Sequence, residues 1–345
     1  MDSPSVSVVV PGRNCARTVR DCLTALIAAA RESPIKEIIF VDDGSTDDTA
    51  AIVSDLPVTY IAGEGRGAGA ARNIGWRAAR NPLIWFVDAD CVVESDALTP
   101  LLGHLDDRQV VGVGGSYGNM NEDSLLACLI HEEIVARHAR MPHRVNFLAT
   151  FSVVYRREVL QELHGFDERF LKGQDAELAW RAVECGYQLA FDGESRVKHF
   201  HPVSWASYLK TQCRQGYWRV WLHLRYRDHV RGDSYSGLID HLQPPLAAVA
   251  TLTLPLAAIN RFSMIPLACL TILACLQVPM TRRLIARTRS VRYAMFAVLS
   301  FVRAFWRGAG MTAAILALPF TKVGPRSRVD ATEETDAQRG SERHL

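Results

Sequence analysis

Short apolar runs alternate with helix-like stretches along the first third of this 345-residue chain. The runs are Val6–Val10, Ile38–Val41, Val58–Ile61, Leu83–Val87 and Val110–Val113, and the helix-like stretches lie near 17–30, 47–54 and 68–79. Strands that alternate with helices usually pair in parallel, because each helix carries the chain back across the sheet. The sequence therefore predicts an α/β fold in which a mostly parallel sheet is covered by helices on both faces.

Carboxylates follow two of these predicted strands. Asp88, Ala89 and Asp90 follow one strand, and Asp42 and Asp43 follow another. Open α/β sheets bind ligands at the carboxyl ends of their strands, and period-two alternation would make Asp88 and Asp90 point the same way. Such oxygens suit a divalent cation that also binds substrate phosphates, while Asp42 and Asp43 could accept hydrogen bonds from a nucleobase or ribose. The alternative is a chance Asp-x-Asp in a loop or helix cap.

A glycine-rich loop at 63–73 enters a predicted helix. Glycines let the backbone approach a ligand closely, and a helix N-terminus attracts phosphate. Gly65, Gly67 and Ala70 also satisfy the loose dinucleotide-binding pattern, with Asp88 ending the next strand. An NAD-dependent Rossmann-type oxidoreductase is therefore an alternative, although it leaves Asp42 and Asp90 without a role. Binding of NADH in the absence of metal would identify it.

The pattern becomes mixed from about 123 to 200, with helices predicted at 123–139, 156–163 and 175–185. We expect this part to build the acceptor side of a cleft, within a catalytic domain of residues 1–203. Residues 204–240 then mix aromatic and basic side chains, which suits a helix lying at a membrane surface. An amphipathic helix docked on the globular domain explains the same pattern equally well.

Two apolar segments, Leu246–Ile259 and Phe262–Met280, follow within a region of membrane-associated helices predicted at 241–321. The second has 19 residues, enough to cross a hydrocarbon core of roughly 30 Å. A tight helical hairpin and a re-entrant pair both remain open. Arg303 and Arg307 interrupt the last apolar stretch, which favours an interfacial helix, and residues 322–345 are polar enough to be disordered.

The bulk properties indicate where the protein acts. The net charge of +2 gives no reason to expect nucleic acid as a partner. Eight scattered cysteines form no Cys-x-x-Cys pair, and no basic leader precedes the first strand, so we expect a reducing compartment. Arginines at 282–292 follow the apolar hairpin and by the positive-inside tendency belong in the cytoplasm. The sequence thus predicts a cell-membrane protein with a cytoplasmic catalytic domain.

Taken in order, seven short motifs resemble those of the family 2 glycosyltransferases, which are inverting enzymes of the glycosyltransferase A fold. The resemblance runs from Val6 to about Arg227. The motifs are Val-Val-Val-Pro-Gly-Arg-Asn14, Val-Asp-Asp-Gly-Ser45, Gly-Ala-Ala-Arg-Asn-Ile-Gly75, Asp88-Ala-Asp90, Gly165-Phe-Asp-Glu-Arg-Phe170, Gly173-Gln-Asp-Ala-Glu-Leu178 and His199-Phe-His201. Each is weak alone, and their order and spacing make the match specific.

The resemblance implies a role for each matching residue. Pro11, Asp42, Asp43 and Arg72 would contact the nucleotide, and Asp88, with Ala89 beside it, would face the ribose or sugar. Asp90, with His199 or His201, would bind Mg²⁺ or Mn²⁺ at the diphosphate, where a metal neutralises the charge of the leaving group. Asp175 matches the catalytic base that deprotonates the acceptor hydroxyl. Gln174 departs from the family's frequent Glu-Asp pair and removes one cause of a raised base pKa.

Together these observations predict a membrane-anchored, metal-dependent inverting glycosyltransferase that moves a sugar from a nucleotide-diphosphate sugar to a hydroxyl. The membrane-associated region implies a lipid-linked or glycan acceptor at the bilayer surface. Besides the oxidoreductase, a catalytically idle protein that only binds nucleotide sugar is an alternative. The Asp-x-Asp motif and Asp175 argue against idleness.

Overall fold

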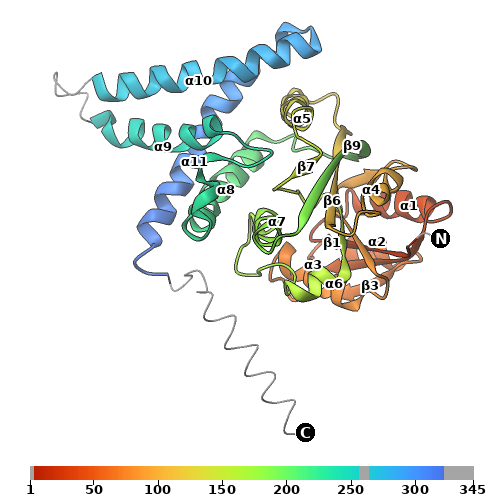
Figure 1. The fold of residues 1–345 in the computed structure, drawn as a ribbon. Coiled ribbons are helices and arrows are strands. Elements are labelled where there is room, and N and C mark those ends of the chain that lie inside the picture. The colour runs from red at the N-terminus through yellow and green to blue at the C-terminus, as the bar shows by residue number, and fades with distance from the viewer. Residues whose placement is uncertain (1–3, 256–263, 322–345) are drawn as a thin grey trace, which may run out of the picture.

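The computed structural model describes residues 4–255 and 264–321 of the chain. An α/β domain occupies the N-terminal part, and a unit of long helices lies along one side of it (Figure 1). The tail predicted to be disordered, 322–345, and the turn between the two predicted apolar segments lie outside the described residues.

One mixed sheet forms the centre of the α/β domain, in the order β3-β2-β1-β4-β8-β6-β9-β5 with β7 beside β9. The strands β1 to β4 pair in parallel, whereas β8 runs antiparallel to both of its neighbours. The strands are β1 (Val6–Gly12), β2 (Ile35–Asp42), β3 (Thr59–Ala62), β4 (Leu83–Val87), β5 (Cys91–Val93), β6 (Val110–Asn119), β7 (Arg144–Val145), β8 (Ser152–Arg156) and β9 (Gln188–His199).

Helices cover both faces of this sheet because its central strands are apolar on both sides. Val8 and Trp85 face one core cluster, whereas Val9 and Phe86 face the other. The first face is covered by α1 (Val19–Ala29) and α4 (Leu98–His104), and the second by α3 (Ala68–Ala78), α6 (Arg157–Glu162) and α7 (Gln174–Glu184). Two more helices, α2 (Thr49–Ser54) and α5 (Leu125–His138), complete the domain.

The α/β prediction is confirmed, and each predicted strand and helix of the first 113 residues is present, although the strand predicted at Val110–Val113 extends to Asn119. Four strands were not predicted, namely β5, β7, β8 and β9. Each of them runs antiparallel to at least one neighbour, and β9 is inserted between β6 and β5. They make the second half of the sheet mixed rather than parallel.

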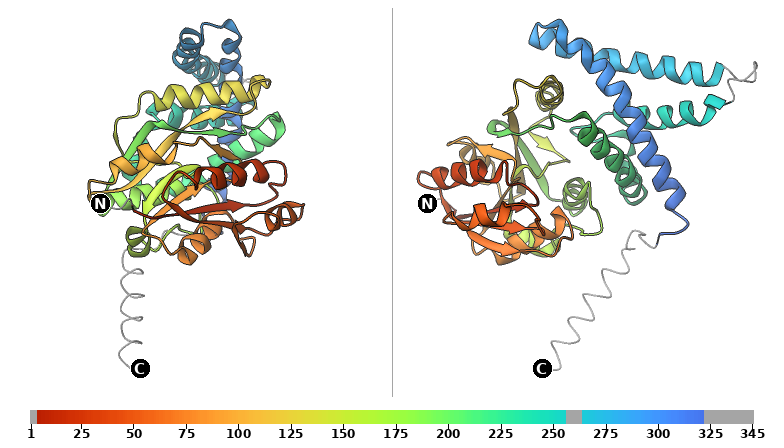
Figure 2. Two further views of the ribbon diagram at one scale, coloured as in Figure 1. Left: turned by 90° about the vertical axis from the view of Figure 1, so that its right-hand side faces the viewer. Right: turned by 180° about the vertical axis from the view of Figure 1, so that it is seen from behind.

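The helical unit consists of α8 (Trp205–Arg225), α9 (Leu238–Thr253), α10 (Met264–Thr288) and α11 (Met295–Ala317), with short 3-10 turns η1 (Arg227–Arg231) and η4 (Val291–Ala294). Figures 1 and 2 show α9 and α10 lying side by side and projecting away from the α/β domain. Within the described residues α10 is the helix long and apolar enough to cross a membrane. Its exposed side chains include Leu267 and Ile272.

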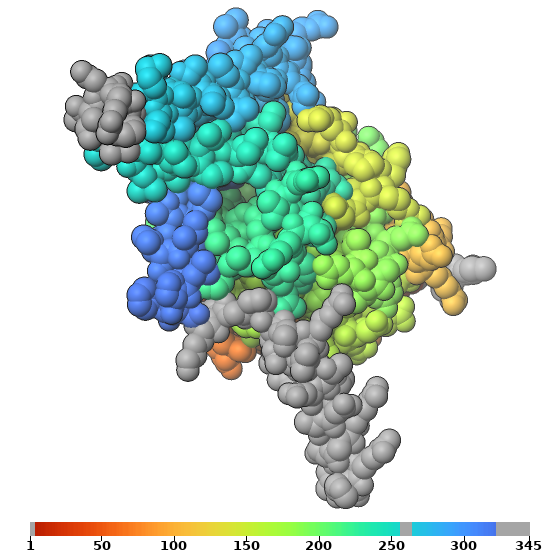
Figure 3. All heavy atoms as spheres, turned by 60° about the vertical axis from the view of Figure 1, so that its left-hand side comes forward, coloured from red at the N-terminus to blue at the C-terminus, as the bar shows by residue number. Residues whose placement is uncertain are grey.

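The inner side of α8 is docked on the α/β domain, as one of the two sequence interpretations expected. Trp221 and Leu222 are buried in a cluster with Phe170 and Trp180. Trp205, at the start of the helix, remains exposed. The space-filling view shows the helices from α8 onward packed as one body against the α/β domain (Figure 3).

The sequence suggested that Arg303 interrupts an apolar stretch at a bilayer surface, but the structure places it elsewhere. Its guanidinium is buried and makes two hydrogen bonds to the Glu133 carboxylate on α5, at 2.5 and 2.8 Å. Arg307 donates to the side-chain amide oxygens of Gln212 and Gln215 on α8. Both arginines therefore turn towards the protein, and they tie α11 to the rest of the molecule.

Candidate functional site

The first part of the site lies where β1 and β2 end. Pro11 lies near the end of β1 rather than in the following loop, and it pairs with Val41. Asp42 is buried, accepting from the Tyr60 hydroxyl at 3.0 Å and from the Ser45 N–H at 2.8 Å. Asp43 is also buried and accepts from the Gly67 N–H at 2.9 Å. These bonds fix both carboxylates at the carboxyl edge of the sheet.

The glycine-rich loop supports these carboxylates and does not follow the dinucleotide-binding pattern. It connects β3, at the edge of the sheet, to α3, whereas that pattern lies after a central strand, where the strand order reverses. Gly67 has φ +105°, which few other residues adopt. A Cβ at Gly63 would lie 2.9 Å from the Asp42 carbonyl oxygen. The loop is shaped to pack on the end of β2, and the oxidoreductase alternative fails.

Asp88 and Asp90 do not point the same way from a strand, because β4 ends at Val87 and the chain turns. The Cys91 N–H donates to the Asp88 carbonyl at 3.0 Å, closing a tight turn around Ala89. Asp88 then faces α3 and Asp90 faces β9. The turn therefore gives the two carboxylates different partners.

Arg72 on α3 is the partner of Asp88, with Nη2 and Oδ1 2.5 Å apart. Arg72 is only 3% exposed, and its Nε and Nη1 have no hydrogen-bond partner among the described residues. Its guanidinium lies 5.7 Å from the centre of the Phe166 ring. A buried guanidinium with unpaired N–H groups is costly unless a ligand completes it. The residue is suited to binding an anionic or hydroxyl-rich ligand.

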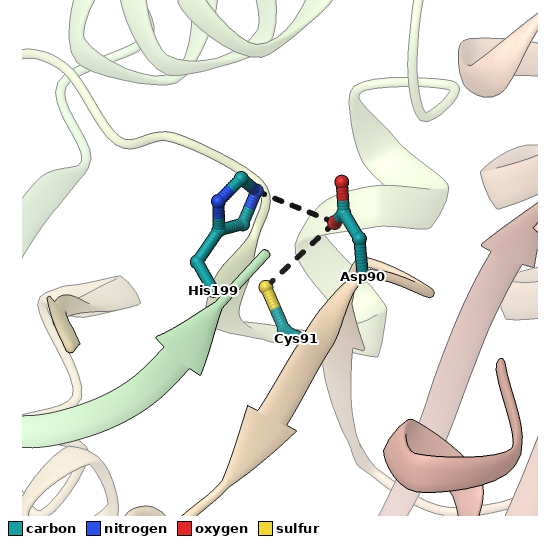
Figure 4. Close-up of side chains that lie close together, drawn as sticks. All are labelled: Asp90, Cys91 and His199. Atoms are coloured by element: carbon teal, nitrogen blue, oxygen red, sulfur yellow. Dashed lines mark hydrogen bonds and ion pairs between the residues drawn. The ribbon is translucent and has the colours of Figure 1, made fainter. Parts of the chain in front are cut away.

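Asp90 and His199 meet because β5 pairs with the end of β9, which places Cys91 opposite His199 (Figure 4). The His199 Nε2 lies 3.4 Å from Asp90 Oδ1, and Cys91 Sγ lies 4.0 Å from the same oxygen. Among the described residues these three form the group that could hold a metal ion. Burial would raise the pKa of Asp90, but the charge and hydrogen bond of His199 outweigh it and lower the pKa. The lowered pKa favours the ionised form of Asp90, which is the form that binds a metal ion.

Cys91 fits a metal site poorly. Burial raises the pKa of its thiol well above the usual value, and the charges of Asp90 and Asp88 act in the same direction. The thiolate is the form that binds metal, and burial beside two carboxylates disfavours that form. The donor set that remains is a carboxylate oxygen and an imidazole nitrogen.

His201 lies behind His199. The two Nδ1 atoms are 3.1 Å apart and the ring centres 4.6 Å apart. Burial lowers the pKa of His201 far below the usual range, with the positive charge of His199 acting in the same direction. A neutral His201 can accept a hydrogen bond from the Nδ1–H of His199, which leaves the Nε2 of His199 free to bind a metal. This geometry favours His199 over His201 as the ligand.

Asp175 lies in the first turn of α7. Its Oδ1 accepts from the Ala176 N–H at 2.9 Å. Burial raises the pKa of the Asp175 carboxyl, and the charge of Asp88 acts in the same direction. The Ala176 hydrogen bond and the charge of Arg72 lower the pKa, but the net shift is upward. These electrostatic interactions place Asp175 near the Arg72–Asp88 pair. A carboxylate with a raised pKa at a cleft suits proton abstraction.

Gln174, the departure from the family pattern, is buried, and its Oε1 has no hydrogen-bond partner within residues 4–255 and 264–321.

Sequence reasoning missed Asn73, which joins α3 to the loop at 165–170. Its Oδ1 accepts from the Phe166 and Trp76 N–H groups, both at 2.9 Å, and its Nδ2 donates to the Phe166 carbonyl at 2.8 Å. The same Nδ2 donates to Glu168 at 2.9 Å. The motif Ala-Ala-Arg72-Asn73 thus combines a site residue with a structural one. The asparagine directly after the arginine was the available signal.

Comparison with known proteins gives a consistent result. Residues 7–163, which run from β1 to the end of α6, match the family model described as glycosyl transferase family 2. The pre-mycofactocin glycosyltransferase of Mycobacterium tuberculosis is 28% identical over 243 residues, covering 65% of this chain and 48% of that protein. The glycosyltransferase AglE of Haloferax volcanii is 28% identical over 237 residues, covering 64% of this chain and 75% of that protein. The chain thus spans about half the length of the first relative.

The fold has a solved counterpart in the mannosyltransferase PcManGT from Pyrobaculum calidifontis, whose structure is a complex with GDP-Man and Mn2+. The TM-score is 0.57 at 20% sequence identity, and the match covers 92% of this chain and 88% of that one. The likeness therefore includes the helical unit as well as the sheet. With its matching sequence motifs, sheet and relatives, the α/β domain of this chain belongs to glycosyltransferase family 2 and has the glycosyltransferase A fold.

Proposed function

We propose that this protein is a metal-dependent inverting glycosyltransferase that moves a sugar from a nucleotide-diphosphate sugar to an acceptor hydroxyl. One observation carries the proposal: the Asp90–His199 pair, the Asp88–Arg72 pair and Asp175 converge at one edge of the sheet. A cation ligand set, an anion-binding group and a base are the three parts that this reaction needs.

Donor binding is assigned to the ends of β1, β2 and β4. Asp42, Asp43 and Pro11 would face the nucleoside, since they lie at the paired ends of β1 and β2, where Asp43 bonds to the glycine-rich loop. Arg72 would direct its unpaired N–H groups to the donor, and Asp88, held by Arg72, would accept from a ribose or sugar hydroxyl. Ala89 is buried at the turn between the two aspartates, where its small side chain fits.

Asp90 and His199 would hold the metal ion, with His201 orienting His199. A nitrogen ligand favours Mn²⁺ over Mg²⁺, because Mg²⁺ prefers oxygen ligands and ideal octahedral geometry. PcManGT was solved with Mn2+, which supports the same choice. When bound, the ion neutralises the negative charge that develops on the departing nucleoside diphosphate.

Asp175 would act as the base. Its carboxylate takes the proton from the acceptor hydroxyl as that oxygen forms a bond to the anomeric carbon of the donor. The bond from the anomeric carbon to the diphosphate breaks on the opposite face, so the configuration inverts and the nucleoside diphosphate leaves with the bonding electrons. The proton remains on Asp175 until solvent removes it.

The helical unit suggests where the acceptor comes from. We propose that residues 1–203 form the catalytic domain, that 204–240 lie at the interface, and that 241–321 attach the protein to the cell membrane with the catalytic domain in the cytoplasm. The exposed apolar surface of α9 and α10 supports this attachment. A lipid-linked or glycan acceptor would then be presented at the bilayer surface, with no role for nucleic acid.

The proposal is tested with purified protein, Mn²⁺ and a panel of nucleotide sugars. We expect metal-dependent transfer or slow donor hydrolysis by the wild type. Asp90→Ala should weaken Mn²⁺-dependent nucleotide binding, whereas Asp175→Asn should keep binding and lose about a hundred- to ten-thousandfold in turnover. An idle binding protein would bind donor without turnover in every variant. Absence of any metal-dependent turnover with the panel would refute the proposal.

A further inference from the structure

The charged side chains in the C-terminal part of the helical unit are all basic. No acidic residue occurs between His241 and Thr321, and the arginines of this stretch lie mainly after the apolar part of α10. Arg282, Arg283, Arg287, Arg289 and Arg292 are all exposed at the end of α10 and the start of η4. Apolar side chains such as Met264 and Leu267 are exposed towards the other end of the helix. The helix therefore changes from apolar to cationic along its length.

A cavity of about 490 Å³ lies at the cationic end, where η4 meets α5. It is lined by Glu132, Arg287, Thr288, Ser290, Arg292 and Tyr293. The lining holds two guanidinium groups, three hydroxyl-bearing side chains and one carboxylate. Such a set has a net positive charge and is rich in hydrogen-bond donors.

The partners of these groups show what remains available. Arg287 Nε donates to Glu132 at 2.8 Å, and Thr288 donates to the Leu284 carbonyl at 2.8 Å. Arg292 donates to the Tyr293 hydroxyl at 3.1 Å and has no acidic partner among the described residues. The remaining N–H groups of both arginines are free to meet an anion, and a guanidinium pairs well with phosphate.

We propose that this cavity binds the phosphate of an anionic phospholipid headgroup while the apolar surfaces of α9 and α10 enter the same bilayer. From Met264 to Met280 α10 rises about 25 Å, so its arginine end reaches the headgroup level when the apolar end is immersed. Arginines near an anionic surface are attracted to it, each by about fivefold in affinity. The inference rests on the membrane association proposed above and does not depend on sugar transfer.

The position of the cavity connects the bilayer surface to the active site. A second, larger cavity of about 860 Å³ shares Glu132, Arg287, Arg292 and Tyr293 with the first and extends to His131. The His131 ring lies 5.4 Å from that of His201, behind the proposed metal ligand. A headgroup held at η4 would therefore place the membrane surface at the acceptor side of the cleft.

Vesicle flotation with the full-length protein tests the proposal. Binding is measured on neutral phosphatidylcholine vesicles and on vesicles that also contain phosphatidylglycerol. We expect the wild type to bind the anionic vesicles more tightly, and Arg287→Gln with Arg292→Gln to lower that binding about thirtyfold. Binding to neutral vesicles should not change. The matched control is Arg31→Gln with Arg140→Gln, which removes the same charge from exposed positions of the α/β domain and should bind like the wild type.

A variant that is expected to strengthen binding distinguishes a loss of the site from misfolding. Glu132→Gln removes the one carboxylate of the smaller cavity and should strengthen binding to anionic vesicles about fivefold. The headgroup site would be overturned if the arginine pair and its control variant lost vesicle binding equally. It would also be overturned if the arginine pair lost as much binding to neutral vesicles as to anionic ones. Thermal protection of the detergent-solubilised protein by glycerol phosphate without any preference for anionic vesicles would overturn it too. If the protein bound neither kind of vesicle, the proposed membrane association would be refuted instead. Donor turnover measured in detergent tests the proposed sugar transfer separately.

Discussion

The Asp175 carboxyl starts α7 beside the Arg72–Asp88 pair, and burial raises its pKa. A base works only when ionised, so its activity is lost as the pH falls through the raised pKa. We expect kcat/KM to fall on the acidic side at a higher pH than an ordinary aspartate, with a pKa of about 3.9, would give.

A pH–rate profile at saturating Mn²⁺ measures this. Asp88→Asn removes the nearby negative charge that raises the pKa, and the acid limb of any residual activity should move to lower pH. If the acid limb stays at the same pH in this variant, the limb reports the titration of a group other than Asp175.

Asn73 is the residue whose loss we expect to be most costly in the α/β domain. It is buried and makes hydrogen bonds to Phe166, Trp76 and Glu168. Asn73→Ala leaves the buried N–H groups of Phe166 and Trp76 without acceptors, which should cost about 3 kcal/mol. Denaturant unfolding followed by tryptophan fluorescence measures it. Trp76→Phe removes one of these bonds and should cost less; equal losses would contradict the account.

The predicted site residues differ in how visible they are in the sequence. Asp42, Asp43, Asp88 and Asp90 follow buried strands, so the strand pattern alone brings them to one sheet edge. His199 is different, because it meets Asp90 only through the pairing of β5 with β9. That contact joins residues 109 positions apart, and neither strand was predicted. Only the family resemblance indicated the histidine.

At the scale of elements, α8 and α11 approach closely through glycines. A Cβ at Gly310 would overlap the Cys213 carbonyl oxygen on α8, and one at Gly216 would overlap the Arg307 carbonyl oxygen on α11. Both obstacles are backbone atoms, which cannot move aside without separating the helices. Small residues at a helix crossing are what allow backbones to come this close.

Gly310→Ala should therefore lower the free energy of unfolding by about 1–3 kcal/mol or more. Gly103→Ala is the matched control, since Gly103 lies in α4 and a methyl group added there would have no atom within 4 Å. This control should be neutral or stabilise by about 0.5–1 kcal/mol, because alanine favours helix. Thermal unfolding in detergent compares the two. Similar melting temperatures for both variants would show that the crossing tolerates a methyl group.

The elements that the sequence predicted share a property. Parallel strands buried on both faces are continuous apolar runs, so β1, β2 and β4 are easy to recognise. The strand β8 begins with Ser152, and β9 carries charged residues at 192, 194, 196 and 198. These side chains alternate with buried ones. Arg303 could not be placed either, because its partner Glu133 lies 170 positions away.

On the scale of the whole molecule, one buried ionic network joins the catalytic domain to the helical unit. Arg137 on α5 bonds to Glu133 at 2.7 Å and to both carboxylate oxygens of Asp240 on α9. Glu133 in turn bonds to Arg303 on α11. Two arginines and two carboxylates thus connect three helices.

Glu133 makes the stability of this junction dependent on pH. Burial would raise its pKa, but the charges of Arg303 and Arg137 outweigh burial and lower it to about 2. The stabilisation is therefore present above the ordinary glutamate pKa of about 4.3 and is lost as the pH falls towards 2. Glu133→Gln leaves the buried Arg303 without a carboxylate partner and Arg137 with Asp240 alone, and it should cost about 3–5 kcal/mol at pH 7.

Denaturant unfolding of the wild type and of Glu133→Gln between pH 7 and pH 2 tests this. The difference between the two should shrink as the pH falls. Glu184→Gln, an exposed glutamate of α7, should unfold like the wild type at every pH. A constant difference for Glu133→Gln would show that the carboxylate charge is not what stabilises the junction.

The insertion of β9 between β6 and β5 has a consequence for the newly made protein. Asp90 is synthesised long before His199, and it gains its imidazole partner only when β9 enters the sheet. A ribosome-bound chain that has exposed only its first five predicted strands lacks that partner. If the metal site works as proposed, unfinished chains cannot split nucleotide sugars, and the cell spends none of its activated donors before the enzyme is assembled.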